Sequence, residues 1–138
     1  MFTISYDIEG TPRPQGSKRH VGNGVMVESS KYVKEWRSFA KLKATIAMQK
    51  TPRFDKPFGV RLTVWFVFER PKKHFTSKGL RTDAPKFHLS KPDSDKLLRA
   101  LLDSMSGVVF EDDSQVAVIG VEKVYGERAV TKVVVSRC

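Results

Sequence analysis

The alternation of hydrophobic and polar positions predicts strands toward both ends of the chain. Residues 2–8 alternate with the period of a half-buried strand. Residues 58–69 form a longer run of β-branched and aromatic side chains, which predicts a buried strand at the centre of a sheet. Two more strands are expected at 115–125 and 129–136, and the residues between them, 126–128, are few enough for a hairpin.

A first helix is predicted over residues 31–50, where apolar side chains recur every three or four positions. A short strand at 25–27 and capping oxygens at 28–30 precede it, and Pro52 ends it. Basic side chains off the apolar stripe form either a solvated surface or part of a DNA-facing one. The stripe is expected to pack in the core and consists of Tyr32, Val33, Trp36, Phe39, Ala40, Leu42, Ile46 and Ala47.

A second helix is predicted from residue 93 or 94 to residue 105, with a glycine two positions later as its stop signal. Four leucines and a methionine give it one apolar face. Asp95, Arg99 and Asp103 follow at four-residue steps and therefore share a neighbouring ridge, where Arg99 and Asp103 are expected to form an ion pair. Asp93 can approach the side chain of Asp95 only from the cap position before the first turn.

These elements indicate an α+β fold, in which one domain over residues 1–138 has a mixed, mainly antiparallel sheet and two main helices. The chain is long enough to bury one core. No apolar run approaches the roughly 20 residues that span a bilayer, and residues 1–10 have no signal-peptide pattern. We therefore expect a cytoplasmic protein with no membrane partner. The lone Cys138 agrees with a reducing compartment.

Two polar segments are candidates for contacting phosphate. Residues 10–24 combine prolines and glycines with cations, and they offer backbone amides beside charge; a solvated connector is the alternative. Residues 70–92 are longer than most loops of compact domains, which indicates function or mobility. The candidate DNA-binding residues of the two segments are Arg13, Lys18, Arg19, Lys72, Lys73, His88 and Lys91.

The charge distribution separates one window from the rest of the chain. The net charge is +10, and the sequence pI near 9.9 favours nucleic acid as the partner over an anionic membrane surface. Residues 93–113 nevertheless hold six acidic and two basic residues, a net charge of −4. A protein that binds a polyanion has no use for carboxylates on its contact face unless a cation lies between them and the phosphate. This window points to metal-assisted phosphodiester chemistry.

Asp93 and Asp95 at the start of the second helix can form a three-carboxylate magnesium site with Asp112 or Asp113, which precede the strand near residue 115. The alternative is structural, because the same residues can cap a helix and form a turn. An EF-hand calcium loop is not favoured, since its glycine and final glutamate are missing. His74 lacks the neighbouring ligands that a zinc site needs, as does the histidine at position 88.

The order of these motifs resembles one nuclease family. The segment KPDSDKLLRALLDSMSG, then EDDSQV, then a strand containing EKVYG is similar to the RusA-like Holliday junction resolvases, as are the early GTPRPQGSKR loop and the histidine before the KPD segment. The resemblance covers nearly the whole chain. It implies a homodimeric endonuclease that depends on Mg²⁺, with Mn²⁺ as a substitute, and nicks four-way DNA junctions symmetrically for recombination and repair.

The resemblance assigns the metal to Asp93, Asp95 and Asp113. Two neighbouring positions depart from the family pattern. Lys96 stands where asparagine is usual, and Arg99 stands where lysine is frequent. Both are expected to assist catalysis as cations, although arginine is a poor proton shuttle and binds phosphate with a planar fork.

Two other functions stay open at this point. The chain can be a non-catalytic nucleic-acid-binding protein that keeps the same scaffold, or a nuclease directed at RNA. A cleavage assay on junction, flap, duplex and RNA substrates separates the three.

Overall fold

The computed structural model describes residues 3–16, 18–20, 26–28 and 31–138, and its main sheet has four strands in the order β1-β8-β4-β7. The strands are β1 (Thr3–Glu9), β4 (Val60–Glu69), β7 (Val116–Gly126) and β8 (Val130–Arg137). β8 runs antiparallel to β1 and to β4, whereas β7 runs parallel to β4. The predicted α+β class with a mixed, mainly antiparallel sheet is confirmed.

The expected hairpin between the last two strands is wrong. β7 and β8 are not neighbours, because both pair with β4, which lies between them. The short connection crosses over the end of β4, where the Arg70 amide donates to the Gly126 carbonyl. The crossing is close: a Cβ on Gly126 would lie 2.6 Å from Cγ1 of Val67, so glycine is required there.

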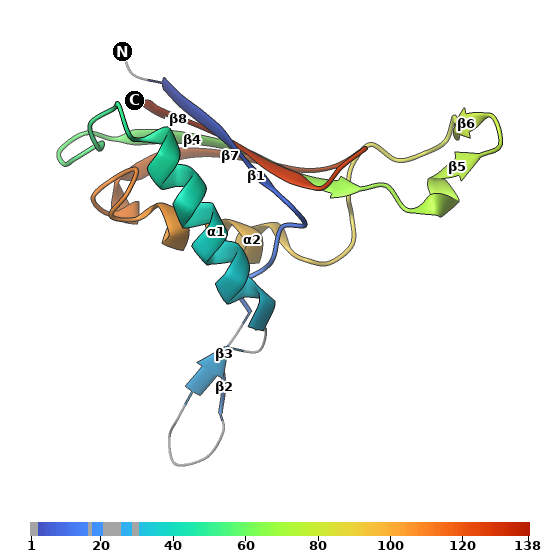
Figure 1. Ribbon diagram of the computed structural model, residues 1–138, viewed down its shortest axis with the longest axis horizontal. Helices are drawn as coiled ribbons and strands as arrows, with labels where there is room; N and C mark the ends of the chain where they lie inside the picture. The colour runs from blue at the N-terminus through green and yellow to red at the C-terminus, as the bar shows by residue number, and fades with distance from the viewer. Residues whose placement is uncertain (1–2, 17, 21–25, 29–30) are drawn as a thin grey trace.

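Both main helices cover one face of the sheet (Figure 1). They are α1 (Lys31–Ala47) and α2 (Ser94–Met105), and they contact each other. Along β4 the side chains alternate between buried and half-exposed, since only one face is covered. The core between sheet and helices includes Leu62, Phe66, Leu97 and Leu101. No helix within the described ranges is long and apolar enough to cross a membrane.

The apolar stripe of α1 is only partly buried. Val33, Trp36 and Ala40 face the core, as predicted. The other large members of the stripe extend around the helix onto the solvent side, because the stripe is wider than the sheet can cover. Those exposed at 39% or more are Tyr32, Phe39, Leu42 and Ile46. The prediction that all of them are core residues is therefore wrong.

Two small hairpins lie outside the main sheet. β2 (Lys18–His20) lies within the segment predicted as a loop, and it pairs with β3 (Met26–Glu28), which overlaps the short strand predicted at 25–27. Residues 25, 29 and 30 of the predicted strand and cap lie outside the described residues. A second hairpin follows the short 3-10 helix η1 (Lys72–His74) and consists of β5 (Phe75–Thr76) and β6 (Gly79–Leu80). η1, β5 and β6 extend away from the main sheet as an arm (Figure 1).

The arm returns to the sheet before α2 begins. The His88 amide donates to the Lys123 carbonyl at 2.9 Å, and the Tyr125 amide donates to the Lys86 carbonyl at 3.0 Å. Residues 86–88 therefore continue the sheet along the outer edge of β7. This pairing sets the starting point of the segment that leads into α2.

Candidate active site

One face of α2 lines a recess of about 260 Å³ together with Asp113. The polar side chains on the helix side are Asp95, Arg99 and Asp103, which the four-residue spacing placed on one ridge. Leu98 and Leu102 form the apolar part of the lining. The recess therefore gathers three carboxylates and one guanidinium from two separate segments, and it is called the acidic recess below.

Gln115 holds Asp113 beside the helix. Asp113 begins the short 3-10 helix η2 (Asp113–Gln115), and the buried Gln115 side chain ends it. Its amide nitrogen donates to the carbonyls of Phe54 at 2.9 Å and Phe58 at 3.0 Å, and its carbonyl oxygen accepts from the Asp112 amide at 2.9 Å. These bonds tie the turn to the loop before β4. Sequence reasoning missed this role, although a glutamine opening a predicted strand was the available signal.

Glu111 and Asp112, which the sequence left undecided, are occupied by structural contacts. The Asp112 side chain accepts from the Ser114 amide at 3.2 Å and lies 3.6 Å from the Lys56 ammonium. Glu111 accepts from the Lys56 amide at 3.1 Å. The Ser114 amide and the hydrogen bond with Asp113 lower the pKa of Asp112. Asp113 is consequently the member of the acidic trio that lines the recess.

The pKa of Asp113 is raised. The hydrogen bond with Asp112 is the largest cause, followed by burial and by repulsion from Asp112 and Asp103. All of these causes disfavour the ionised form of the Asp113 carboxyl. A divalent cation bound to carboxylate oxygens would favour that form, and the oxygen donors of this recess suit Mg²⁺.

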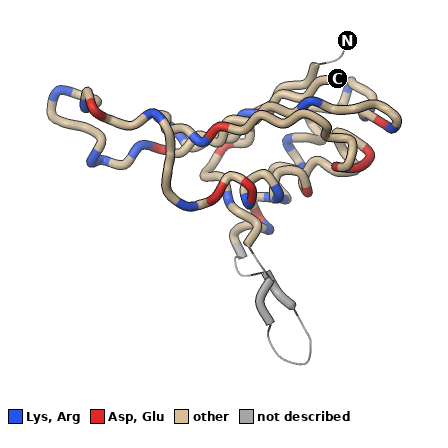
Figure 2. Tube along the Cα trace, turned by 180° about the vertical axis from the view of Figure 1, so that it is seen from behind, with Lys and Arg blue, Asp and Glu red and all other residues tan. Residues whose placement is uncertain are grey.

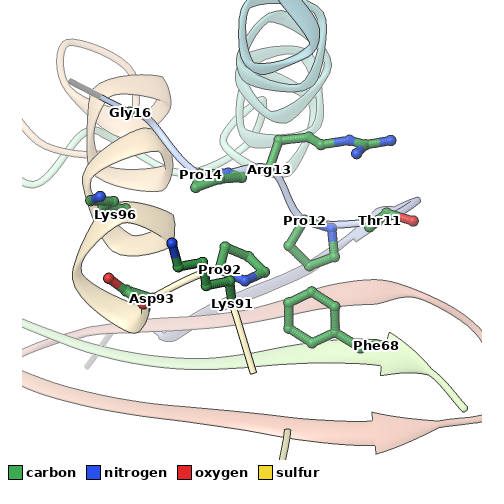
Figure 3. Close-up of a pocket in the computed structure, with 10 residues that line it drawn as sticks. All are labelled: Thr11, Pro12, Arg13, Pro14, Gly16, Phe68, Lys91, Pro92, Asp93 and Lys96. Carbon is green, nitrogen blue, oxygen red and sulfur yellow. The ribbon is translucent and has the colours of Figure 1, made fainter. Parts of the chain in front are cut away.

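Asp93 lies on the other side of the start of α2. It is the N-cap residue, as the sequence allowed, but its side chain makes no capping hydrogen bond. It lines a second recess of about 370 Å³ with Lys91 and Lys96 (Figure 3). Of the predicted metal ligands, the structure brings Asp95 and Asp113 to one recess and leaves Asp93 in the next. Within the described ranges, no three acidic, histidine or cysteine side chains are close enough to enclose a metal ion.

The two predicted catalytic cations are separated in the same way. Arg99 lines the acidic recess, and Lys96 lines the recess of Asp93. The expected ion pair between Arg99 and Asp103 is not formed among the described side chains, whose salt bridges lie elsewhere. Both side chains are exposed, and exposed pairs gain little from contact. Arg99 is therefore not engaged by its neighbour on the helix.

Lys123 was missed as a site residue. Its ammonium donates to the carbonyls of Ser90 at 2.7 Å and Pro92 at 2.6 Å. These two bonds fix the backbone immediately before Asp93. The sequence signal was a lysine on a predicted strand at a position that alternation assigns to the covered face.

The predicted DNA-binding residues are spread over the molecule. Arg13 is exposed, with its guanidinium 5.2 Å from the centre of the Tyr32 ring, and Lys91 lines the recess of Asp93. Lys72 and Lys73 are exposed on the arm, where Figure 2 shows several basic residues. The side chains of Lys18 and Arg19 lie outside the described residues.

His74 of the arm and His88, which lies beside β7, pack in one aromatic cluster. His88 stacks on Phe68 with ring centres 4.0 Å apart, and His74 meets Tyr125 edge-on at 4.8 Å. Burial, followed by the charge of Lys123, lowers the pKa of His88. Burial and the charge of Arg70 lower the pKa of His74. Both rings are therefore neutral at pH 7, and neither offers a phosphate the charge of an imidazolium.

The fold and the recesses define a basic α+β protein whose acidic recess takes its carboxylates from one helix and one turn. A family model described as "Endodeoxyribonuclease RusA" matches residues 7–136. The chain therefore belongs to the RusA family of endodeoxyribonucleases, which confirms the resemblance found in the motifs.

One curated relative is similar along its whole length. "Uncharacterized protein YqaN" of Bacillus subtilis (strain 168) is 29% identical over 143 residues, which cover 98% of this chain and 96% of the relative. The name of that relative assigns it no activity.

Proposed function

We propose that this protein is a Mg²⁺-dependent, structure-selective endonuclease that resolves four-way DNA junctions by paired symmetric nicks during recombination and repair. The observation that carries the proposal is the acidic recess, in which Asp95, Asp113 and Arg99 meet on a chain of net charge +10. Membership of the RusA endodeoxyribonuclease family supports the same reaction class. We place the protein in the cytoplasm, as a single RusA-like domain over residues 1–138.

Asp95 and Asp113 would hold the metal ion, and Asp93 would join them from the cap of the same helix. Carboxylate oxygens are the ligands that Mg²⁺ prefers, and Mn²⁺ accepts the same set. The raised pKa of Asp113 agrees with this assignment, because a nearby cation would stabilise its ionised form. The chemistry supplied by such an ion is activation of water and neutralisation of charge on the phosphodiester.

The cations beside the carboxylates would orient the phosphodiester. Arg99 can hold two phosphate oxygens with its planar guanidinium, and arginine is a poor proton shuttle. It therefore suits charge stabilisation and not proton transfer. Lys96 would bind an adjacent phosphate as a point charge from the neighbouring recess.

The remaining cations would hold the junction arms. Lys72 and Lys73 on the arm and Arg13 beside Tyr32 of α1 are exposed, and none of the three lines the acidic recess. Two copies related by a two-fold axis would place two acidic recesses on a junction of matching symmetry, so we propose a homodimer. If roughly 6–10 phosphates are contacted, affinity should fall by about 10³- to 10⁵-fold between about 50 and 200 mM salt.

The decisive experiment compares the wild type with Asp113→Asn on a synthetic four-way junction, with and without Mg²⁺. The substitution keeps the size of the side chain and removes its charge. Cleavage should fall by at least about 100-fold, since even residues that only orient metal ligands contribute about 10- to 100-fold. Junction binding should be kept or strengthened, because a negative charge has left the DNA-facing surface.

The same assay tests the alternatives. A wild type that binds junctions and never nicks them with Mg²⁺ or Mn²⁺ contradicts the nuclease proposal and supports a non-catalytic binding protein. Preferential cutting of RNA would contradict the assignment of a DNA junction as substrate.

A further inference from the structure

The recess of Asp93 differs in character from the acidic one. Its volume is about 370 Å³, within the range of roughly 300–1,000 Å³ typical of small-ligand sites. Figure 3 shows the Phe68 ring below Pro12 and Pro92, while the Lys91 amino group extends toward Pro14. The lining thus combines proline and phenylalanine rings with charged side chains, which are Arg13, Lys91, Asp93 and Lys96. We call it the ring-walled recess.

The walls are held in place by contacts outside the recess. Phe68 is only 7% exposed, and its ring stacks on His88 at an angle of 17°. The opposite wall is attached to α2, because the Gln15 amide donates to the Lys96 carbonyl at 3.0 Å. The Gln15 side chain in turn accepts from Arg37 of α1 at 2.7 Å. The recess is therefore built before any ligand arrives, which lowers the entropic cost of binding.

Two kinds of chemistry meet in this recess. Flat apolar rings bind the face of a planar ring, as aromatic side chains do with unstacked bases. Lys91 and Lys96 also line the recess and offer point charges of the kind that bind phosphate, and Lys96 lies next in sequence to Asp95 of the acidic recess. A site for phosphate alone would not need ring walls, and a site for an apolar ligand would not place two lysines in its lining.

We propose that the ring-walled recess holds one unstacked nucleotide of the DNA strand that is cut, next to the scissile phosphodiester. The base would lie against Phe68 and the proline rings, and Lys91 and Lys96 would bind its phosphate. The cost of unstacking is lowest at a junction, where base pairs end. The recess would thereby favour branched over linear DNA. This inference rests on the nuclease function proposed above.

The test places a fluorescent base beside the nick. The position cut by the wild type is mapped first, and 2-aminopurine is then placed at each flanking nucleotide in separate junctions. These are bound by the Asp113→Asn variant, which leaves them intact. One flanking position should brighten several-fold on binding, because the base leaves the DNA stack, whereas 2-aminopurine within a distant arm should not change.

Changes in the DNA and in the protein check the same contact. An abasic site at the brightening position should weaken binding by about 5- to 150-fold, the contribution of one stacked base, and an abasic site in a distant arm should not. On the Asp113→Asn background, Phe68→Leu should remove most of the brightening, and Pro14→Ala, outside the core, should reduce it. Lys50→Ala changes a cation in the turn after α1, outside both recesses, and serves as the control. Thermal melting checks folding.

Two results separate this inference from the proposed function. If the wild type nicks junctions but every flanking 2-aminopurine stays dim and abasic sites bind normally, the nucleotide recess is wrong and the nuclease remains. If the wild type nicks nothing, the nuclease function itself fails, and the inference fails with it.

Discussion

The two recesses beside α2 share one short stretch of chain and have opposite character. Asp95 and Lys96 are adjacent in sequence, yet one lines the acidic recess and the other lines the ring-walled recess. Successive helical residues point about 100° apart, so the first turn of α2 serves both. The comparison teaches that one helix can present oxygen ligands for a cation on one side and cations for a phosphate on the other.

The largest effect should come from the acidic recess. Asp95→Asn should reduce cleavage by at least about 100-fold and leave junction binding unchanged or tighter, because it removes a ligand and a negative charge together. Asp103→Asn removes the same charge from the same recess and is the matched control. If the two variants lose cleavage equally, the distinction between ligand and neighbour is wrong.

Lys123 should affect both recesses through the backbone before Asp93. Lys123→Met leaves the carbonyls of Ser90 and Pro92 without their donor, which should lower the free energy of unfolding by about 1–3 kcal/mol. It should also reduce cleavage by about 10-fold or more, with Lys123→Arg partly restoring it. The separating readout is the rise in melting temperature with Mg²⁺, which should shrink in Lys123→Met. If the rise in melting temperature with Mg²⁺ is unchanged, Lys123 contributes to stability alone.

Removing a cation from the ring-walled recess should weaken junction binding more than cleavage. This is the opposite of the result expected for Asp95→Asn. Lys91→Ala should weaken junction binding and lower the slope of log affinity against log salt by about 1. Cleavage of bound junction should change less than binding does. Titrations at several salt concentrations measure the slope, and a slope equal to that of the wild type would show that Lys91 contacts no phosphate.

The smallest expected effect concerns the ring that supports Phe68. The lowered pKa of His88 means that the folded protein holds this ring neutral, whereas the unfolded chain protonates it near its ordinary value of about 6.5. Stability is therefore fully present above that pH and declines as the pH falls below it. His88→Phe keeps the stack and should flatten part of this decline, with His74 responsible for a further part. Denaturant titrations from pH 7.5 to 5 measure how the free energy of unfolding changes with pH in the wild type and in His88→Phe. Equal slopes for the two proteins would contradict this prediction.

The local sequence pattern was enough to predict the helices and strands. It was less useful for predicting which strands lie side by side. Periodicity placed β4 and α2 within about two residues, and spacing placed Asp95, Arg99 and Asp103 on one face. It could not tell that β4 separates β7 from β8, because strand order depends on residues about sixty positions apart.

The same limit applies to the site. Acid content and motif order identified Asp113, but its position depends on Gln115 reaching the backbone at Phe54 and Phe58, which no local pattern encodes. Asp93 and Asp95 are two positions apart, and the sequence could not decide whether the cap residue faces its neighbour. The structure places them in different recesses.

The strand order also determines when the main sheet can be completed while the chain is being synthesised. β8 comes last along the chain but is inserted between β1 and β4, so a nascent chain shorter than about 130 residues has a gap in the middle of its sheet. The part of β4 from Val60 to Val67 gains one of its two neighbouring strands only when β8 fills this gap. Domains generally fold as units once their residues are available. A ribosome-bound fragment that already contains every carboxylate of the acidic recess should therefore have no nuclease activity, so cleavage begins only after nearly the whole chain has emerged.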